Sequence, residues 1–151
     1  MMKKIGLTVL LGFVITGIVV VVSAETSHNG IVRSLPEVRF EQDEDVKCLK
    51  SFPESGDPRT GPSTYILSAP KKCIVPWHYH TAEEQLVVIR GSVLTEMDGM
   101  PSSTLGAGGF ALMPSKKHHQ FSCRSDSECL MIVIFDRPYD IFWVEASGGN
   151  H

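Results

Sequence analysis

Short apolar runs alternate with turn residues along most of the chain. From residue 37 onward, runs of apolar and β-branched residues are separated by clusters of glycine, proline and polar residues, which is typical of β-strands. No stretch after residue 24 keeps apolar residues at helical spacing for three turns, so an all-β sandwich or barrel is predicted. The runs that predict strands are 46–49, 64–68, 73–80, 85–89, 92–97, 110–113, 118–123, 129–135 and 140–144.

The run 85–89 is apolar on both faces of the predicted strand. Alternate residues of a strand point to opposite sides, so Leu86 and Val88 share one face while Val87 and Ile89 share the other. One face is expected to line the interior of the barrel. The other requires a second layer, either another sheet or a partner subunit, which makes a homodimer one expectation.

The N-terminal segment has the features of a secretory signal peptide. Two lysines, Lys3 and Lys4, precede the uncharged apolar run 5–22, and small residues follow it, which predicts cleavage after Ala24 and a secreted or periplasmic protein. The alternative is an uncleaved N-terminal membrane anchor, because a run of this length is about the shortest that spans a bilayer. Residues 25–36 carry little pattern and are expected to form a flexible lead-in.

Length and charge limit what the rest of the chain can be. The 151 residues, 42% of them hydrophobic, are enough for one domain with its own core, which we place at residues 37–147. Removal of residues 1–24 leaves 12 of the 14 basic residues against all 17 acidic ones, a formal charge of −5. An acidic chain is a poor nucleic-acid binder, and after cleavage no membrane association is expected.

Four cysteines in an exported chain are compatible with two disulfides. Cys123 and Cys129 flank a short polar segment that is typical of a hairpin loop, which favours their pairing and leaves Cys48 for Cys73. The alternative is four buried free thiols that pack as small apolar side chains.

Three histidines and one glutamate form a candidate metal site. His78 and His80 are two residues apart and so share one face of a strand, and Glu84 follows beyond a predicted bend. His119 comes from a later strand. Three imidazoles and a carboxylate suit divalent iron, manganese or nickel, with zinc and copper as alternatives, and four ligands leave coordination positions open for substrate or dioxygen.

The spacing of these residues resembles the cupin superfamily. Its first motif, G-x5-H-x-H-x3,4-E-x6-G, matches His78, His80, Glu84 and Gly91 without gaps, and its second, G-x5-P-x-G-x2-H-x3-N, matches Gly108, Pro114 and His119. The resemblance covers residues 63–135. It implies a cupin-type β-barrel, a double-stranded β-helix or jelly roll, with the metal inside one mouth. It also selects His119 over His118, and Glu84 over Glu83.

The sequence departs from the two motifs at three positions. Lys72 and Lys116 stand where the motifs have glycine, which concerns the shape of two turns more than metal binding. Cys123 replaces the final asparagine of the second motif. Four residues after His119, it is a candidate pocket residue, a soft neighbour of the metal or a disulfide partner; a disulfide and a metal-facing thiol exclude each other.

The surroundings of the candidate site give weaker signals. Phe121 shares a face with His119 and is a candidate pocket wall, with ordinary core packing as the alternative. Lys116 and Lys117 precede His119 and could attract an anionic substrate, or simply form a solvated loop.

The leading functional hypothesis is an exported metal-binding cupin that acts on a small molecule by oxygenase-type chemistry, since no separate general base stands out. The alternatives are a non-catalytic module that binds or senses a small molecule or metal, and a dimeric scaffold without metal.

Overall fold

The computed structural model describes residues 30–144 of the chain. The predicted leader with its cleavage site at Ala24, the start of the predicted lead-in, and residues 145–147 of the predicted domain lie outside this range. The compact unit discussed below begins at Arg33. Within residues 30–144, no helix is both long enough and apolar enough to cross a membrane.

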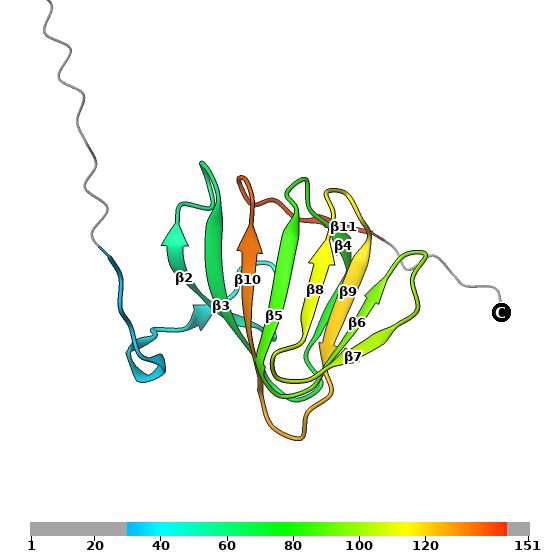
Figure 1. Ribbon diagram of the computed structural model, residues 1–151, viewed down its shortest axis with the longest axis horizontal. Coiled ribbons are helices and arrows are strands. Elements are labelled where there is room, and N and C mark those ends of the chain that lie inside the picture. Colours follow the sequence, from blue (N-terminus) through cyan, green and yellow to red (C-terminus); the bar gives the residue numbers. More distant parts are fainter. Residues whose placement is uncertain (1–29, 145–151) are drawn as a thin grey trace, which may run out of the picture. The chain divides into compact units, whose positions relative to one another are not determined.

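The chain forms two antiparallel sheets, as the all-β prediction required (Figure 1). The first sheet has the strand order β1–β2–β3–β10–β5–β8, with bounds Glu41–Gln42, Lys50–Gly56, Ser63–Ala69, Cys129–Phe135, Glu84–Arg90 and Phe110–Met113. The second has the order β11–β4–β9–β6–β7, with bounds Phe142–Trp143, Ile74–Tyr79, His119–Cys123, Val93–Met97 and Ser103–Leu105. A short 3-10 helix, η1 (Leu35–Glu37), precedes them. This arrangement is a jelly roll, the fold that the resemblance to cupins implies.

The prediction of a strand at 46–49 is wrong. The carboxylate of Asp43 accepts hydrogen bonds from the backbone N–H groups of Asp45 and Val46, and the Leu49 N–H bonds back to Val46, so the segment turns. Val46 and Leu49 are nevertheless buried in the core. The apolar pattern at 46–49 therefore indicated burial correctly, but these residues are buried from a turn and not from a strand.

No strand was predicted at the position of β2. This strand contains Pro53, which lacks an N–H to donate, and the pairing with β3 shifts register between Pro53 and Ser55. This bulge lets a strand pass through a proline. The short strand β7 was not predicted, and β11 covers only two of the five residues predicted to be strand at 140–144.

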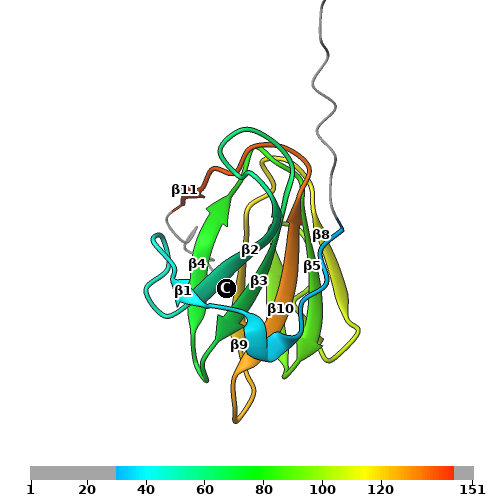
Figure 2. The same ribbon diagram turned by 90° about the vertical axis from the view of Figure 1, so that its left-hand side faces the viewer.

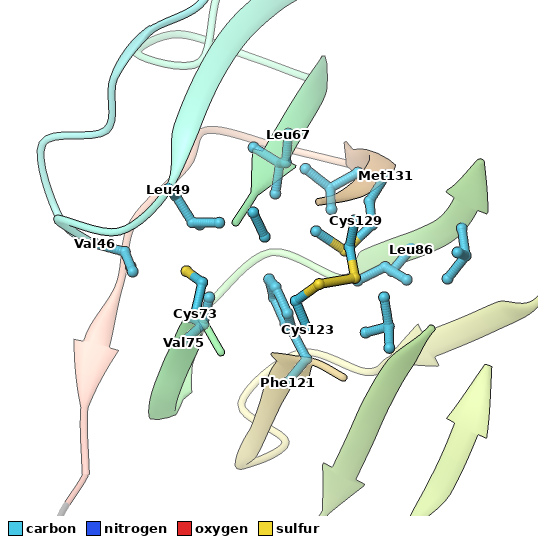
Figure 3. Packing of buried hydrophobic residues seen from close by; sticks show 14 of the residues in the cluster. Val46, Leu49, Leu67, Cys73, Val75, Leu86, Phe121, Cys123, Cys129 and Met131 are labelled. Carbon is cyan, nitrogen blue, oxygen red and sulfur yellow. A yellow bond between two sulfur atoms is a disulfide. The ribbon is translucent and has the colours of Figure 1, made fainter. Parts of the chain in front are cut away.

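The core lies between the two sheets. Leu86 and Val88 of β5, Met131 of β10 and Val93 of β6 are at most 1% exposed. Figure 3 shows the Cys123–Cys129 disulfide among these side chains, close to Leu86 and Met131. A fully buried side chain of this size contributes about 2 kcal/mol to stability by leaving water. These residues therefore stabilise this end of the barrel.

The outer face of the first sheet is covered on one side only. Leu130 of β10 is buried against Val38, which follows η1 and packs in one cluster with Ile66. Figure 2 shows this segment crossing the outside of β3 and β10. Further along the sheet, Ile89 and Phe110 are exposed. The expected second layer over both faces is thus present only in part, and a partner subunit stays a prediction.

Glycine and its substitutes shape three turns. Gly91 has φ +93°, and a Cβ atom there would lie 2.9 Å from the Sγ atom of Cys129, so glycine is required. Lys72 and Lys116 have φ values of 65° and 62°, the left-handed conformation that glycine adopts readily. The two departures from the cupin motifs therefore keep a glycine-like backbone.

Candidate metal centre

The four predicted ligands come together at one end of the barrel. His78 lies in β4, His119 begins β9 directly opposite it, and Glu84 begins β5. His80 follows the end of β4. Their side chains are at most 4% exposed, and one nitrogen or oxygen from each lies within 4.8 Å of those of the others.

Each histidine is oriented by a backbone carbonyl. The Nδ1 atom of His78 bonds to the carbonyl of Pro76 at 2.6 Å, and that of His119 to the carbonyl of Lys117 at 2.8 Å. The Nδ1 atom of His80 bonds to the carbonyl of Asp140. A carbonyl can only accept, so each Nδ1 carries the proton and, in a neutral ring, each Nε2 keeps a free lone pair. All three rings thus offer Nε2 to the cluster.

The ligand atoms are spaced as they would be around one ion. The Oε2 atom of Glu84 lies 3.1 Å from Nε2 of His80 and 3.1 Å from Nε2 of His119. Bonds from a transition metal to such atoms are about 2.1 Å, so two ligands at a right angle lie about 3 Å apart. The residues therefore fit a transition metal ion.

The charge states of the cluster also suit a cation. Burial, with the nearby His119, lowers the pKa of His78 to about 4, so its ring is neutral at pH 7. Burial would raise the pKa of Glu84, but the hydrogen bonds that the Nε2 atoms of His119 and His80 donate when those rings are protonated outweigh it and hold the pKa well below its usual range. A bound metal ion would take the place of these Nε2 protons. The site therefore presents an ionised carboxylate at neutral pH.

A C-terminal strap, which we define as residues 139–144, holds two of the ligands. The backbone carbonyl of Asp140 accepts a hydrogen bond from the Nδ1 atom of His80. Its carboxylate accepts two more from Thr81, one from the backbone N–H at 2.7 Å and one from the Thr81 hydroxyl at 2.5 Å. Trp143 pairs with His78 across β11 and β4, with the ring centres 5.6 Å apart. Sequence patterns predicted a strand here but no part in the site, because a backbone carbonyl has no side-chain signature.

A cavity of about 390 Å³ opens beside the ligands. His78, His80 and Glu84 line its buried end, and the candidate pocket residue Phe121 forms part of its wall. Its other lining residues include Tyr139, whose hydroxyl donates to the carboxylate of Asp45 at 3.0 Å. This bond links the strap to the segment after β1.

Several other predicted residues lie elsewhere. Cys123 is paired with Cys129 and does not line the cavity, so of its proposed roles it takes that of disulfide partner; Cys48 is paired with Cys73. Lys116 and Lys117 are not among the residues that line the cavity, which favours the alternative of a solvated loop.

The neighbours of the ligands point away from the site. The ring of His118 stacks on Tyr79, with centroids 5.4 Å apart, and Tyr79 stacks in turn on Phe142 at 5.0 Å. Glu83 uses its backbone N–H to bind Asp136 and is not part of the ligand group. His28 and His151 lie outside the described residues.

The fold and this site define a class: a small jelly-roll β-barrel with an interior group of three histidines and one glutamate able to hold a metal ion. Comparison with known families gives the same class, because residues 65–135 match the family described as Cupin domain. Residues 65–135 of this chain belong to the cupin superfamily.

Solved structures of the same fold have diverse functions. The polyketide cyclase RemF from Streptomyces resistomycificus is 18% identical, with a TM-score of 0.67, over 80% of this chain and 89% of that one. The DMSP lyase DddQ from Ruegeria pomeroyi DSS-3 is 18% identical, with a TM-score of 0.61, over 74% and 63%. An RmlC-like cupin from Shewanella frigidimarina NCIMB 400 is 17% identical, with a TM-score of 0.60, over 73% and 92%.

At such low identities these similarities define the fold alone. No curated protein matches the chain significantly.

Proposed function

We propose that this chain is an exported metalloprotein that binds one divalent transition metal ion and acts on a small molecule in the adjoining cavity. The ion would be held by His78, His80, Glu84 and His119. Nitrogen and carboxylate ligands of this kind suit iron, manganese or nickel, with zinc and copper also compatible.

One observation carries the proposal: each of the three histidines has its Nδ1 atom fixed by a backbone carbonyl, the Nε2 atoms of His80 and His119 both lie 3.1 Å from the Glu84 carboxylate, and His78 belongs to the same close group. A histidine that only fills a core has no need of this convergence. Hydrogen bonding of the distal nitrogen is the usual way in which proteins orient metal-binding imidazoles.

The residues around the cavity have different roles in the proposed function. The three rings and Glu84 supply the ligands, while Phe121 and Val133 keep the buried end of the cavity apolar. Burial and the charge of Asp45 raise the pKa of Tyr139, so its hydroxyl keeps its proton and stays bonded to that carboxylate. When bound, a transition ion would add Lewis acidity or redox chemistry at its open positions.

Oxygenase-type chemistry is the reaction class we favour for this site. Its support is the lack of a second acid–base pair among the described residues that line the buried end of the cavity, which leaves the chemistry to the metal. Activation of dioxygen requires open coordination positions, and four protein ligands provide them on a six-coordinate ion.

The test of function is reconstitution followed by turnover. The metal-free protein is loaded separately with Fe(II), Mn(II) and Ni(II), and oxygen uptake is followed with catechols, thiols and keto acids. The proposal expects uptake that depends on one of these metals and that His80→Ala abolishes. Tight metal and ligand binding without turnover of any bound compound would instead favour the binding or sensing module.

Export is part of the proposal and has support in the folded unit. The disulfides Cys48–Cys73 and Cys123–Cys129 are bonds that persist in oxidising compartments outside the cytosol. Mass spectrometry of the protein recovered from such a compartment should give an N-terminus at Glu25. An intact N-terminus in the membrane fraction would favour the anchor.

A further inference from the structure

The rim of the cavity, which we define as its solvent-exposed or half-buried polar lining residues, is strongly acidic. Four carboxylates lie there in one segment, those of Glu41, Asp43, Glu44 and Asp45. Arg59 is the one lysine or arginine among the described lining residues, and its guanidinium is bonded to the carboxylate of Asp57 at 3.1 and 3.2 Å. Its charge is thus largely balanced, and the rim repels anions.

Aromatic rings form the wall between the rim and the candidate metal ligands. Tyr65, Phe135 and Tyr139 all line the cavity. The ring centre of Phe135 lies 6.5 Å from that of Tyr65 and 5.1 Å from that of Tyr139. The π-electrons of such rings attract cations, most strongly organic ones that have little water to lose.

The negative charge of the rim is felt inside the cavity. Burial raises the pKa of Tyr65, and the charges of nearby carboxylates, those of Asp43, Asp57 and Glu44, raise it further. Groups that disfavour a phenolate there favour a cation at the same place. The side chains lining the deep end, His78, His80 and Glu84, are at most 4% exposed and face the same space.

We infer that the cavity selects a small organic cation, a protonated amine or quaternary ammonium, held between the rim carboxylates and the aromatic wall. The rest of such a molecule would reach toward the four candidate ligands. The inference rests on the proposed function in taking this cavity as the binding site. The acidic segment and Tyr139 both lie outside the part of the chain that matches the cupin family, residues 65–135, so this selectivity belongs to the chain itself.

Three compounds of one shape test the inference. Choline, its uncharged carbon analogue 3,3-dimethylbutan-1-ol and the anion 3,3-dimethylbutanoate are titrated into the protein at low salt, with binding followed by NMR. We expect choline to bind about tenfold more tightly than the neutral analogue, and the anion to bind most weakly. The preference should shrink as salt is added.

Charge variants assign the preference to the rim. The exposed residues Glu41 and Glu44 are replaced together by glutamine, and the control carries Asp98→Asn with Asp126→Asn, two exposed acids that do not line the cavity. We expect the first variant to lose most of the preference for choline while it keeps its affinity for the neutral analogue. The control, with the same change in net charge, should match the wild type.

Three results would overturn the inference: no binding of choline at millimolar concentration, equal or tighter binding of the neutral analogue, or equal loss of preference in both variants. The titrations are run on metal-free and on metal-loaded protein. Metal content is measured separately, so a protein without metal that still prefers choline would refute the proposed metal site and leave the cation preference standing.

Discussion

The Nδ1 atom of His80 bonds to the backbone carbonyl of Asp140, 60 residues further along the chain. The carboxylate of Asp140 is in turn fixed by both the N–H and the hydroxyl of Thr81, the residue that follows His80. Asp140 therefore links the strap to the segment between β4 and β5 that contains His80 and Thr81. We call this link the clamp. The orientation of a candidate ligand depends on a segment outside the two cupin motifs.

Asp140→Ala should weaken metal binding without removing a ligand. The carbonyl that holds His80 remains, but the strap loses its two bonds to Thr81, so we expect metal affinity to fall about tenfold or more, as is typical when the support of a ligand is lost. Competition with a chelating dye measures the affinity. Asp140→Asn, whose amide can still bond to Thr81, should recover most of it; equal affinity in all three proteins would contradict the clamp.

The stability of the metal-free protein should fall in acid because of His78. Its pKa is about 4 in the folded chain and about 6.5 in an unfolded one. Between these values only the unfolded chain takes up the proton, so the contribution of His78 is complete above about pH 6.5 and is lost as the pH falls toward 4, by about 3 kcal/mol at most.

Urea unfolding of the wild type and of His78→Gln at several pH values isolates this contribution. The unfolding free energy of the wild type, relative to that of His78→Gln, should decrease as the pH falls from 7 to 4. A difference that stays constant over this range would show that His78 is not buried as a neutral ring.

Removal of metal should lower the stability of the whole barrel. A ligand that binds only the folded chain, at 100 times its Kd, adds about 2.7 kcal/mol to the unfolding free energy. Thermal unfolding of metal-loaded protein before and after addition of a chelator measures the effect. His118→Ala, which lies beside a ligand but faces outward, should show the same drop; a chelator that leaves Tm unchanged would argue against a metal bound by the folded state.

Glycine at the two left-handed turn positions should stabilise the protein. A side chain in this conformation costs about 1 kcal/mol or somewhat more, and the added flexibility of glycine in the unfolded chain offsets part of the gain. We expect Lys72→Gly and Lys116→Gly each to raise the unfolding free energy by about 0.5 kcal/mol. Lys50→Gly, inside strand β2, serves as the contrast and should destabilise. Destabilisation by all three changes would refute the argument.

The sequence was enough to predict the jelly roll and the group of three histidines and one glutamate that the structure brings together. Strand period places His78 and His80 on one side of a strand, and the spacing to Gly91 distinguishes Glu84 from Glu83. Such local rules hold because the motifs lie in regular strands whose direction is fixed by alternation.

What the sequence did not predict depends on contacts between distant segments. Val46 and Leu49 are buried through a turn held by Asp43, a side-chain cap that outweighs the apolar pattern. Asp140 meets His80 only after β10 has crossed the barrel. No local sequence pattern predicts such a contact. The acidic residues of the rim entered the prediction only through the net charge of the chain.

The most direct test of the account is the metal content of two neighbouring histidine variants. His119 is a candidate ligand with a buried ring, whereas His118, the residue just before β9, stacks on Tyr79. Elemental analysis of the purified protein, after loading and removal of free metal, should give about one transition metal per chain for the wild type and for His118→Ala, and almost none for His119→Ala. Metal in equal amounts in all three proteins, or in none, would contradict the proposed site.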